Sequence, residues 1–172
     1  PRDIVETNFD FYGRTLSGTP EIRERWKRGV AVVEGSIGEA VGREYVARHF
    51  PPASKAMMEE LVGNLLRAYR ESISSLDWMG EETKQRAYAK LDMFRSKIGY
   101  PDTFRDYSSI KVERGDLLGN IARTTEFESR RQINKIDKPL DRKEWGMTPP
   151  TVNAYYNGSY NEIVFPAGIL QP

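Results

Sequence analysis

Apolar residues recur at spacings of three and four along the first half of the chain, which predicts long amphipathic helices. The first of these follows Thr19-Pro20-Glu21, which offers a capping hydroxyl, a proline for the first helical position and an acid for the first turn. Pro51-Pro52 ends it. Its apolar stripe consists of Ile22, Trp26, Val30, Val33, Ile37, Val41 and Tyr45.

Four glycines interrupt this predicted helix, at positions 29, 35, 38 and 42. Each weakens a helix by up to about 1 kcal/mol relative to alanine. Close packing of another helix would compensate for that loss, and a kink is the alternative.

Three further helices follow by the same criterion. Ser54 is a candidate cap for the second, whose predicted buried face is Met58, Leu61, Val62, Leu65, Tyr69, Ile73 and Leu76. The third begins near Glu81 or Glu82, and its stripe of Ala87, Leu91, Phe94 and Ile98 ends at Gly99-Tyr100-Pro101. The fourth runs from about Asp116 to Ile136. Its Arg130-Arg131 could hold a phosphate or carboxylate, but the neighbouring Glu126 and Glu128 favour ordinary surface ion pairs.

The pattern changes to a period of two in the last 22 residues. Val152, Ala154 and Tyr156 alternate with Thr151, Asn153 and Tyr155, as in a strand with two different faces. Asn157-Gly158 predicts a tight turn, and residues 162–165 form the return strand before Pro166. We therefore expect a mainly α fold of about four long helices with a short C-terminal β-hairpin. An unpaired strand carrying Asn153-Ala154 could hold a peptide by its backbone.

The composition of the chain excludes or disfavours several classes of function. Lys and Arg number 26 and Asp and Glu 25, so a nucleic-acid binder, which segregates basic residues, is disfavoured. The chain has no cysteine, which excludes disulfides and thiolate metal sites, and no apolar run near the roughly 18 residues that span a bilayer. Its one histidine, His49, cannot supply the two histidines of a helical zinc peptidase motif. A cation at a helix C-terminus or a packing role suits His49 better, and no metal ligand is assigned.

Several phrases of the chain resemble the neprilysin-like zinc metallopeptidases of family M13, and the resemblance runs from about Phe9 to Pro172. They are Arg25-Trp26-Lys27-Arg28, Gly42-Arg43-Glu44-Tyr45-Val46, Leu76-Asp77-Trp78-Met79, Lys97-Ile98-Gly99-Tyr100-Pro101-Asp102, Val152-Asn153-Ala154-Tyr155-Tyr156 and, the most specific, residues 161–172 (NEIVFPAGILQP). Animal members commonly carry cysteine where this chain has Gly29, so it looks like a bacterial member.

The resemblance implies a segment of a larger α+β metallopeptidase. Residues 1–138 would belong to its helical N-terminal domain, and residues 139–172 to a linker and the first strands of its catalytic domain. In the family a zinc-binding His-Glu-x-x-His helix comes shortly after the last phrase. The expectation is therefore that this segment carries no catalytic residue, binds no zinc and is inactive when isolated, whereas the intact enzyme uses zinc to hydrolyse peptides.

By the same resemblance, Asn153 and Ala154 hydrogen-bond the backbone of a bound peptide. Ile169 resembles a residue that lines the pocket for the side chain after the scissile bond, although a core position for Ile169 stays open. The expected partners are a peptide substrate and the remainder of the same polypeptide, with self-association through the C-terminal edge. The rival interpretation is a peptide-binding module that acts by strand addition without chemistry. The compartment, bacterial cytoplasm or exported, is left undecided.

Overall fold

A computed structural model describes residues 2–171 and divides the chain into two compact units, Pro1–Gly35 and Ser36–Pro172. The first unit holds α1 (Arg2–Asn8), a π-helical stretch η1 (Phe9–Leu16) and the beginning of α2 (Arg25–His49). The predicted helix start at Thr19-Pro20 is wrong. Gly18 has a φ of +65°, and the Thr19 N–H donates to the Gly13 carbonyl, so Thr19 closes the preceding helical stretch and does not open the next.

The glycines of α2 have different surroundings. The helix is interrupted at Ile37, whose φ and ψ are −135° and 40°, so the kink alternative holds there. A Cβ on Gly29 or Gly35 would meet no atom within 4 Å, but one on Gly42 would lie 2.5 Å from Pro149 Cδ. Close packing thus explains Gly42, and its neighbour is a loop proline and not a helix.

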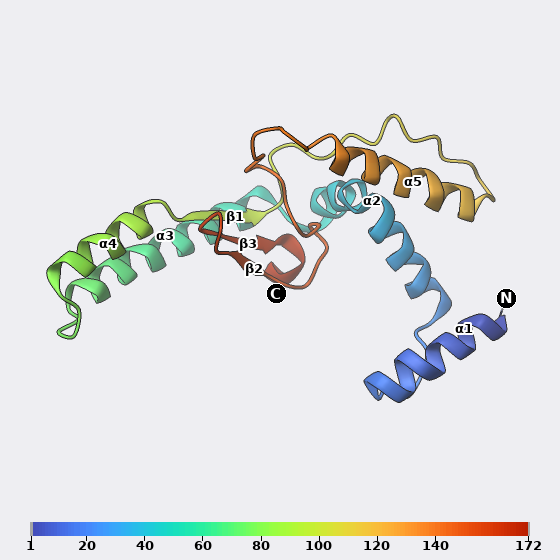
Figure 1. Cartoon of the computed structure of the whole chain (residues 1–172), viewed down its shortest axis with the longest axis horizontal. Helices are drawn as coiled ribbons and strands as arrows, with labels where there is room; N and C mark the ends of the chain where they lie inside the picture. Colours follow the sequence, from blue (N-terminus) through green and yellow to red (C-terminus); the bar gives the residue numbers. More distant parts are fainter. Residues whose placement is uncertain (1, 172) are drawn as a thin grey trace. The chain divides into compact units, whose positions relative to one another are not determined.

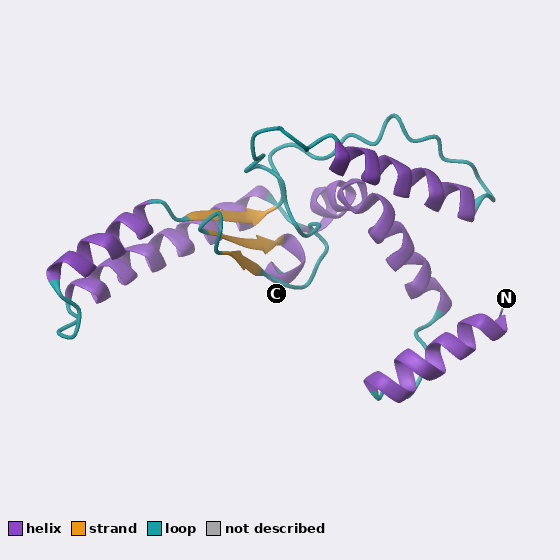
Figure 2. Ribbon diagram, in the orientation of Figure 1, coloured by secondary structure: helices purple, strands orange, loops and turns teal. Residues whose placement is uncertain are grey.

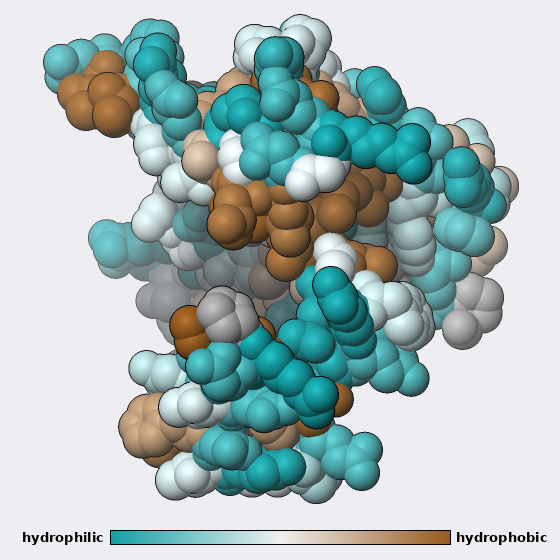
Figure 3. Space-filling model, turned by 90° about the vertical axis from the view of Figure 1, so that its right-hand side faces the viewer, coloured by the Kyte–Doolittle hydropathy of each residue, from teal (hydrophilic) through white to brown (hydrophobic). Residues whose placement is uncertain are grey.

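Helices α3 (Pro52–Ser74) and α4 (Glu81–Asp92) lie side by side (Figure 1). The predicted Ser54 cap is wrong, because the cap position is Pro51 and the Ser54 N–H already donates to the Pro51 carbonyl. The predicted buried face of α3 is only partly buried: Val62 is buried, whereas Leu61, Leu65 and Tyr69 are exposed. Figure 3, which views the molecule from another side, also shows apolar side chains gathered at the surface.

The third predicted helix is too long. Helix α4 ends at Asp92, and Arg95–Gly99 form strand β1, so Phe94 and Ile98 do not continue a helical stripe. Tertiary pairing decides this segment, because β1 pairs in parallel with β3 and buries Ile98. Gly99, with a φ of +78°, ends the strand against Phe50, whose ring would lie 2.4 Å from an added Cβ.

The sheet has the strand order β1-β3-β2, with β2 at Tyr155–Asn157 and β3 at Glu162–Pro166 (Figure 2). Strand β2 pairs antiparallel with β3, so the predicted hairpin is present. It is shorter than predicted, since residues 151–154 lie outside the ladder. Its turn is also longer, because the Asn157 side chain accepts the N–H groups of Ser159 and Tyr160, and the positive φ falls on Asn161.

The central strand β3 carries several of the fully buried residues of the second unit. Glu162, Val164 and Pro166 are each less than 2% exposed, and the 3₁₀ turn η2 (Ala167–Leu170) continues directly from them. Helix α5 (Leu117–Ile133) is capped by Asp116, whose Oδ1 accepts the Gly119 N–H at 3.0 Å. The helices and the small sheet together confirm the predicted mainly helical fold with a short C-terminal β-hairpin. No helix within residues 2–171 is long and apolar enough to cross a membrane.

Candidate functional site

The candidate site is the outer edge of the sheet at β2. Within residues 2–171 the ladder places β3 on one side of β2 and no strand on the other. Asn153 and Ala154 come immediately before this strand, and Asn153 is exposed. The Asn153 Oδ1 accepts the N–H of Ala154 at 2.8 Å, so the amide lies against the backbone group that a bound peptide would need.

Gly168 draws η2 toward the segment that leads into this edge. Its N–H donates to the Pro149 carbonyl at 2.7 Å. An added Cβ would lie 2.4 Å from the Pro150 oxygen and 2.9 Å from the Thr151 oxygen, so only glycine fits here. Ile169 follows Gly168 and is 40% exposed. Its side chain is therefore presented at the surface of a turn that packs two residues upstream of Asn153.

A short loop segment, residues 144–146, lies beside the sheet. The Gly146 N–H donates to the Tyr155 hydroxyl at 2.8 Å, and Tyr155 is the first residue of β2. Burial raises the pKa of Tyr155, so its hydroxyl stays protonated at neutral pH. Trp145 is 8% exposed and anchors this loop to the core.

A buried ion pair joins the neighbouring strands β1 and β3 and contacts this loop. Lys97 of β1 donates to Glu162 Oε1 of β3 at 3.0 Å and to the Glu144 carbonyl at 2.8 Å. The side chains of Lys97 and Glu162 are 13% and 2% exposed. Because the pair is withdrawn from water, each charge depends on the other for compensation.

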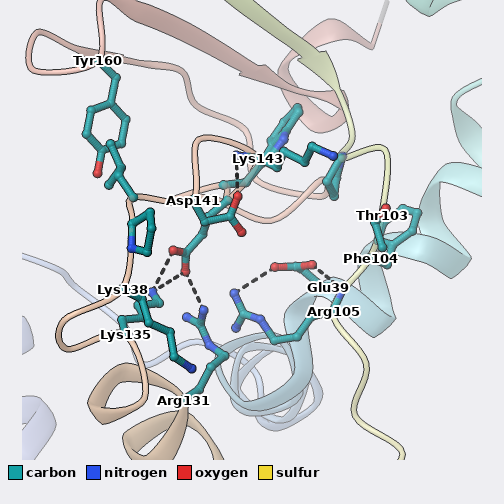
Figure 4. Close-up of a pocket in the computed structure, with 15 residues that line it drawn as sticks. Glu39, Thr103, Phe104, Arg105, Arg131, Lys135, Lys138, Asp141, Lys143 and Tyr160 are labelled. Carbon is teal, nitrogen blue, oxygen red and sulfur yellow. Dashed lines mark hydrogen bonds and ion pairs between the residues drawn. The ribbon is translucent and has the colours of Figure 1, made fainter.

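Charged side chains also surround a cavity of about 670 Å³ next to the 144–146 segment (Figure 4). Glu39 of α2 accepts the backbone N–H of Arg105 at 2.7 Å and pairs with its guanidinium at 2.9 Å. Arg105 pairs in turn with Glu128 of α5 at 3.2 Å. These contacts join α2, the loop after β1 and α5.

Arg131 continues the same series of ion pairs. It contacts Glu128 at 2.7 Å and Glu144 at 2.6 Å, and Lys135 contacts Glu144 at 2.7 Å. Hydrogen bonding from Arg131 lowers the pKa of Glu128 to about 2. Burial acts to raise the pKa of Glu144, but the hydrogen bonds from Lys135 and Arg131 outweigh it and lower that pKa. Both carboxylates are therefore ionised at neutral pH. Arg130 pairs with Glu126 on the surface, so the surface ion-pair interpretation is confirmed for Arg130, whereas Arg131 is partly buried and pairs with Glu144 as well as Glu128.

Comparison with known proteins identifies the family. The model of the N-terminal part of peptidase family M13 matches residues 1–101, more than half of the chain. The chain belongs to peptidase family M13.

Similar M13 proteins are known from bacteria and animals. Zinc metalloprotease Zmp1 of Mycobacterium tuberculosis, solved in complex with an inhibitor, is 54% identical with a TM-score of 0.90, over 99% of this chain and 26% of that one. PepO from Lactobacillus rhamnosis is 31% identical with a TM-score of 0.85, over 94% of this chain and 26% of that one. Human neprilysin is 33% identical over 94% of this chain and 22% of its own length. The chain thus spans about a quarter of the length of these relatives.

The residues of this M13 chain do not fit a zinc ion. No three His, Cys, Asp or Glu side chains are grouped to hold a metal within residues 2–171. His49 is exposed at the end of α2, where its ring contacts Tyr45 and its carbonyl accepts from Gln171. No catalytic step through zinc is derived from these residues.

The structure places the predicted site residues on connected segments. Asn153 and Ala154 are adjacent, and Gly168 links the turn that carries Ile169 to residues 149–151. Sequence reasoning missed the contribution of Lys97, Glu144 and Tyr155. The alternating pattern of residues 151–156 marks a strand, but no spacing connects it to Lys97, more than 50 positions earlier.

Proposed function

We propose that the full-length protein is a zinc-dependent endopeptidase in which this chain supplies scaffold helices and the edge that aligns the peptide substrate. Membership of family M13 and the likeness to zinc metalloproteases support the reaction class. The observation that supports the role of this chain is the free edge of β2, with the Asn153 amide at its beginning. An extended peptide satisfies its own amides by adding to such an edge.

In this proposal Asn153 and Ala154 bind the substrate backbone and orient it. The Asn153 amide turns from the Ala154 N–H to the peptide, which frees that N–H as a second donor. Ile169 contacts the side chain after the scissile bond. No cluster of described residues in this chain would hold the zinc; bound in the intact enzyme, it would supply an activated water for peptide hydrolysis. The proposed domain boundary lies between residues 138 and 139, and the parallel pairing of β1 with β3 would join the two parts.

The test uses the full-length protein and a fluorogenic peptide with a large apolar residue after the scissile bond. Asn153→Ala removes one side-chain hydrogen bond, so kcat/KM should fall about three- to tenfold. Asn64→Ala, an exposed amide on α3, is the matched control and should leave kcat/KM unchanged. Zinc content is measured for each variant. Equal kcat/KM for Asn153→Ala and the parent, at equal zinc content, would refute the role of the edge.

A second variant tests the pocket. Ile169→Ala should reduce the preference for phenylalanine over alanine after the scissile bond, since each lost apolar group changes such a preference by about tenfold or more. An unchanged preference would mean that Ile169 does not line the pocket and serves the core instead. Peptide binding without hydrolysis by the zinc-loaded full-length protein would instead favour a binding module.

A further inference from the structure

Residues 144–146 are held from three directions although they belong to no helix or strand. The Glu144 carboxylate accepts hydrogen bonds from Arg131 and Lys135 at the C-terminal end of α5, at 2.6 Å and 2.7 Å. The Glu144 carbonyl accepts one from Lys97 of β1 at 2.8 Å. The Gly146 N–H donates to Tyr155 of β2 at 2.8 Å. One loop segment thereby contacts a helix and both outer strands of the sheet.

The side chain between these contacts fixes the segment further. Trp145 is buried, so it cannot leave its place without exposing a large apolar surface. Gly146 lies close to the Tyr155 ring, because an added Cβ would be 3.2 Å from the hydroxyl oxygen and 3.3 Å from Cζ. A displacement of residues 144–146 would therefore either break the hydrogen bond to Tyr155 or press against its ring.

Tyr155 is bonded directly to Ala154 in the chain, and its position sets the orientation of the peptide unit between them. A hydrogen bond to a substrate weakens steeply when its angle departs from linearity. We propose that Glu144 and Gly146 are positioning residues that align the edge at Asn153-Ala154 for the peptide substrate, with α5 as their fixed support. This inference depends on the proposed function, because it assumes that a peptide binds to that edge.

The alternative is that residues 144–146 only stabilise the fold. The two roles differ in what a conservative variant changes. A purely structural role lowers the unfolding midpoint and leaves the kinetics of the folded enzyme intact. A positioning role acts on binding to the backbone, which is made in the ground state and the transition state alike. It therefore raises KM while kcat changes little.

The chain offers two matched pairs of variants for the test in the full-length protein. Tyr155→Phe and Tyr69→Phe each remove one hydroxyl, but the Tyr155 hydroxyl binds Gly146 whereas Tyr69 is exposed on α3, away from the edge. Glu144→Gln removes the charge that faces α5, and Glu126→Gln removes one from an exposed pair on the same helix.

The readouts are KM and kcat on the fluorogenic peptide, and amide hydrogen exchange of residues 151–157. Tyr155→Phe and Glu144→Gln should raise KM about three- to tenfold, with kcat within about twofold, and should speed exchange in that segment. Tyr69→Phe and Glu126→Gln should change neither readout. Tyr155→Phe keeps the ring and remains informative if Glu144→Gln does not fold.

Two results would overturn the inference in distinguishable ways. A KM unchanged in Tyr155→Phe and Glu144→Gln, together with a raised KM in Asn153→Ala, refutes the positioning role and leaves the proposed function standing. A KM unchanged in all three variants refutes the peptide-holding edge itself, and the positioning role with it.

Discussion

Residues 144–146 and residues 153–154 lie close along the chain and both adjoin strand β2, yet they are held very differently. The first segment is tied to α5, β1 and β2 and buries Trp145. The second has an exposed asparagine whose side-chain oxygen accepts the N–H of the adjacent Ala154. The comparison indicates that a firmly held segment, residues 144–146, can lie next to an edge, residues 153–154, whose hydrogen-bonding groups stay available to a ligand.

The charges around the two segments follow the same division. Glu144 and Glu162 are buried or partly buried and paired with basic groups of other elements. Pairs such as Arg130–Glu126 join neighbouring turns of one helix in water. Only the first kind can fix one element against another, because its partners are far apart in sequence and screened little by solvent.

The largest expected effect comes from the buried pair beneath the 144–146 segment. Lys97→Met leaves Glu162 charged and buried, which should lower the free energy of unfolding by about 3–5 kcal/mol. Lys97→Met/Glu162→Met should recover most of that loss, since no buried charge remains unpaired. Urea unfolding of both variants, with the exposed Lys111→Met as control, measures this. A loss below about 1 kcal/mol in Lys97→Met would show that the pair does not secure the segment.

The next effect concerns the contact that draws η2 toward the edge. Gly168→Ala places a methyl group 2.4 Å from the Pro150 oxygen, so the backbone must shift. We expect a loss of about 1–3 kcal/mol in unfolding free energy and a weaker preference for large residues after the scissile bond. Gly158→Ala is the control, because the nearest atom to its added Cβ is 3.7 Å away. Equal unfolding midpoints for the two variants would argue against the close approach.

The sequence predicted elements where local pattern and tertiary packing agree. Helix α5 follows its apolar spacing and its Asp116 cap, and the hairpin follows its alternation. The prediction was wrong for residues 94–98, because the spacing of Phe94 and Ile98 fits a helical stripe as well as a strand. The parallel pairing with β3 decides in favour of the strand. The helix start predicted at Thr19-Pro20 was wrong for a related reason, since the Thr19 N–H already donates to the carbonyl that ends the preceding helical stretch.

The candidate site was predictable only in its local part. Asn153 and Ala154 stand out because the alternation and the family phrase coincide there. The support of that edge was not predictable, because Lys97, Glu144 and Tyr155 meet through contacts that span 47 and 9 positions. A single sequence carries no signal for such contacts unless a motif fixes the spacing.

A smaller effect compares two adjacent arginines of α5. Arg131→Ala removes contacts to both Glu128 and Glu144, so about 1–2 kcal/mol of unfolding free energy should be lost. Arg130→Ala removes one exposed pair and should change it by less than about 0.5 kcal/mol. Urea titration of the two variants gives the difference directly. Equal losses would mean that the support of residues 144–146 does not extend to α5.

The smallest effect is a pH dependence of that same support. The pKa of Glu128 is lowered to about 2 from an ordinary 4.5, so its ionised form stabilises the fold above about pH 4.5. That contribution is lost as pH falls through about 2. Because solvent reaches Glu128, the loss should stay below about 1 kcal/mol. Urea midpoints between these pH values should fall less steeply in Glu128→Gln than in Glu126→Gln, whose surface pair leaves Glu128 intact. If the midpoints of the two variants fell equally with pH, Glu128 would not contribute to the acid sensitivity. The connection between α5 and the loop would then depend on Glu144 and not on Glu128.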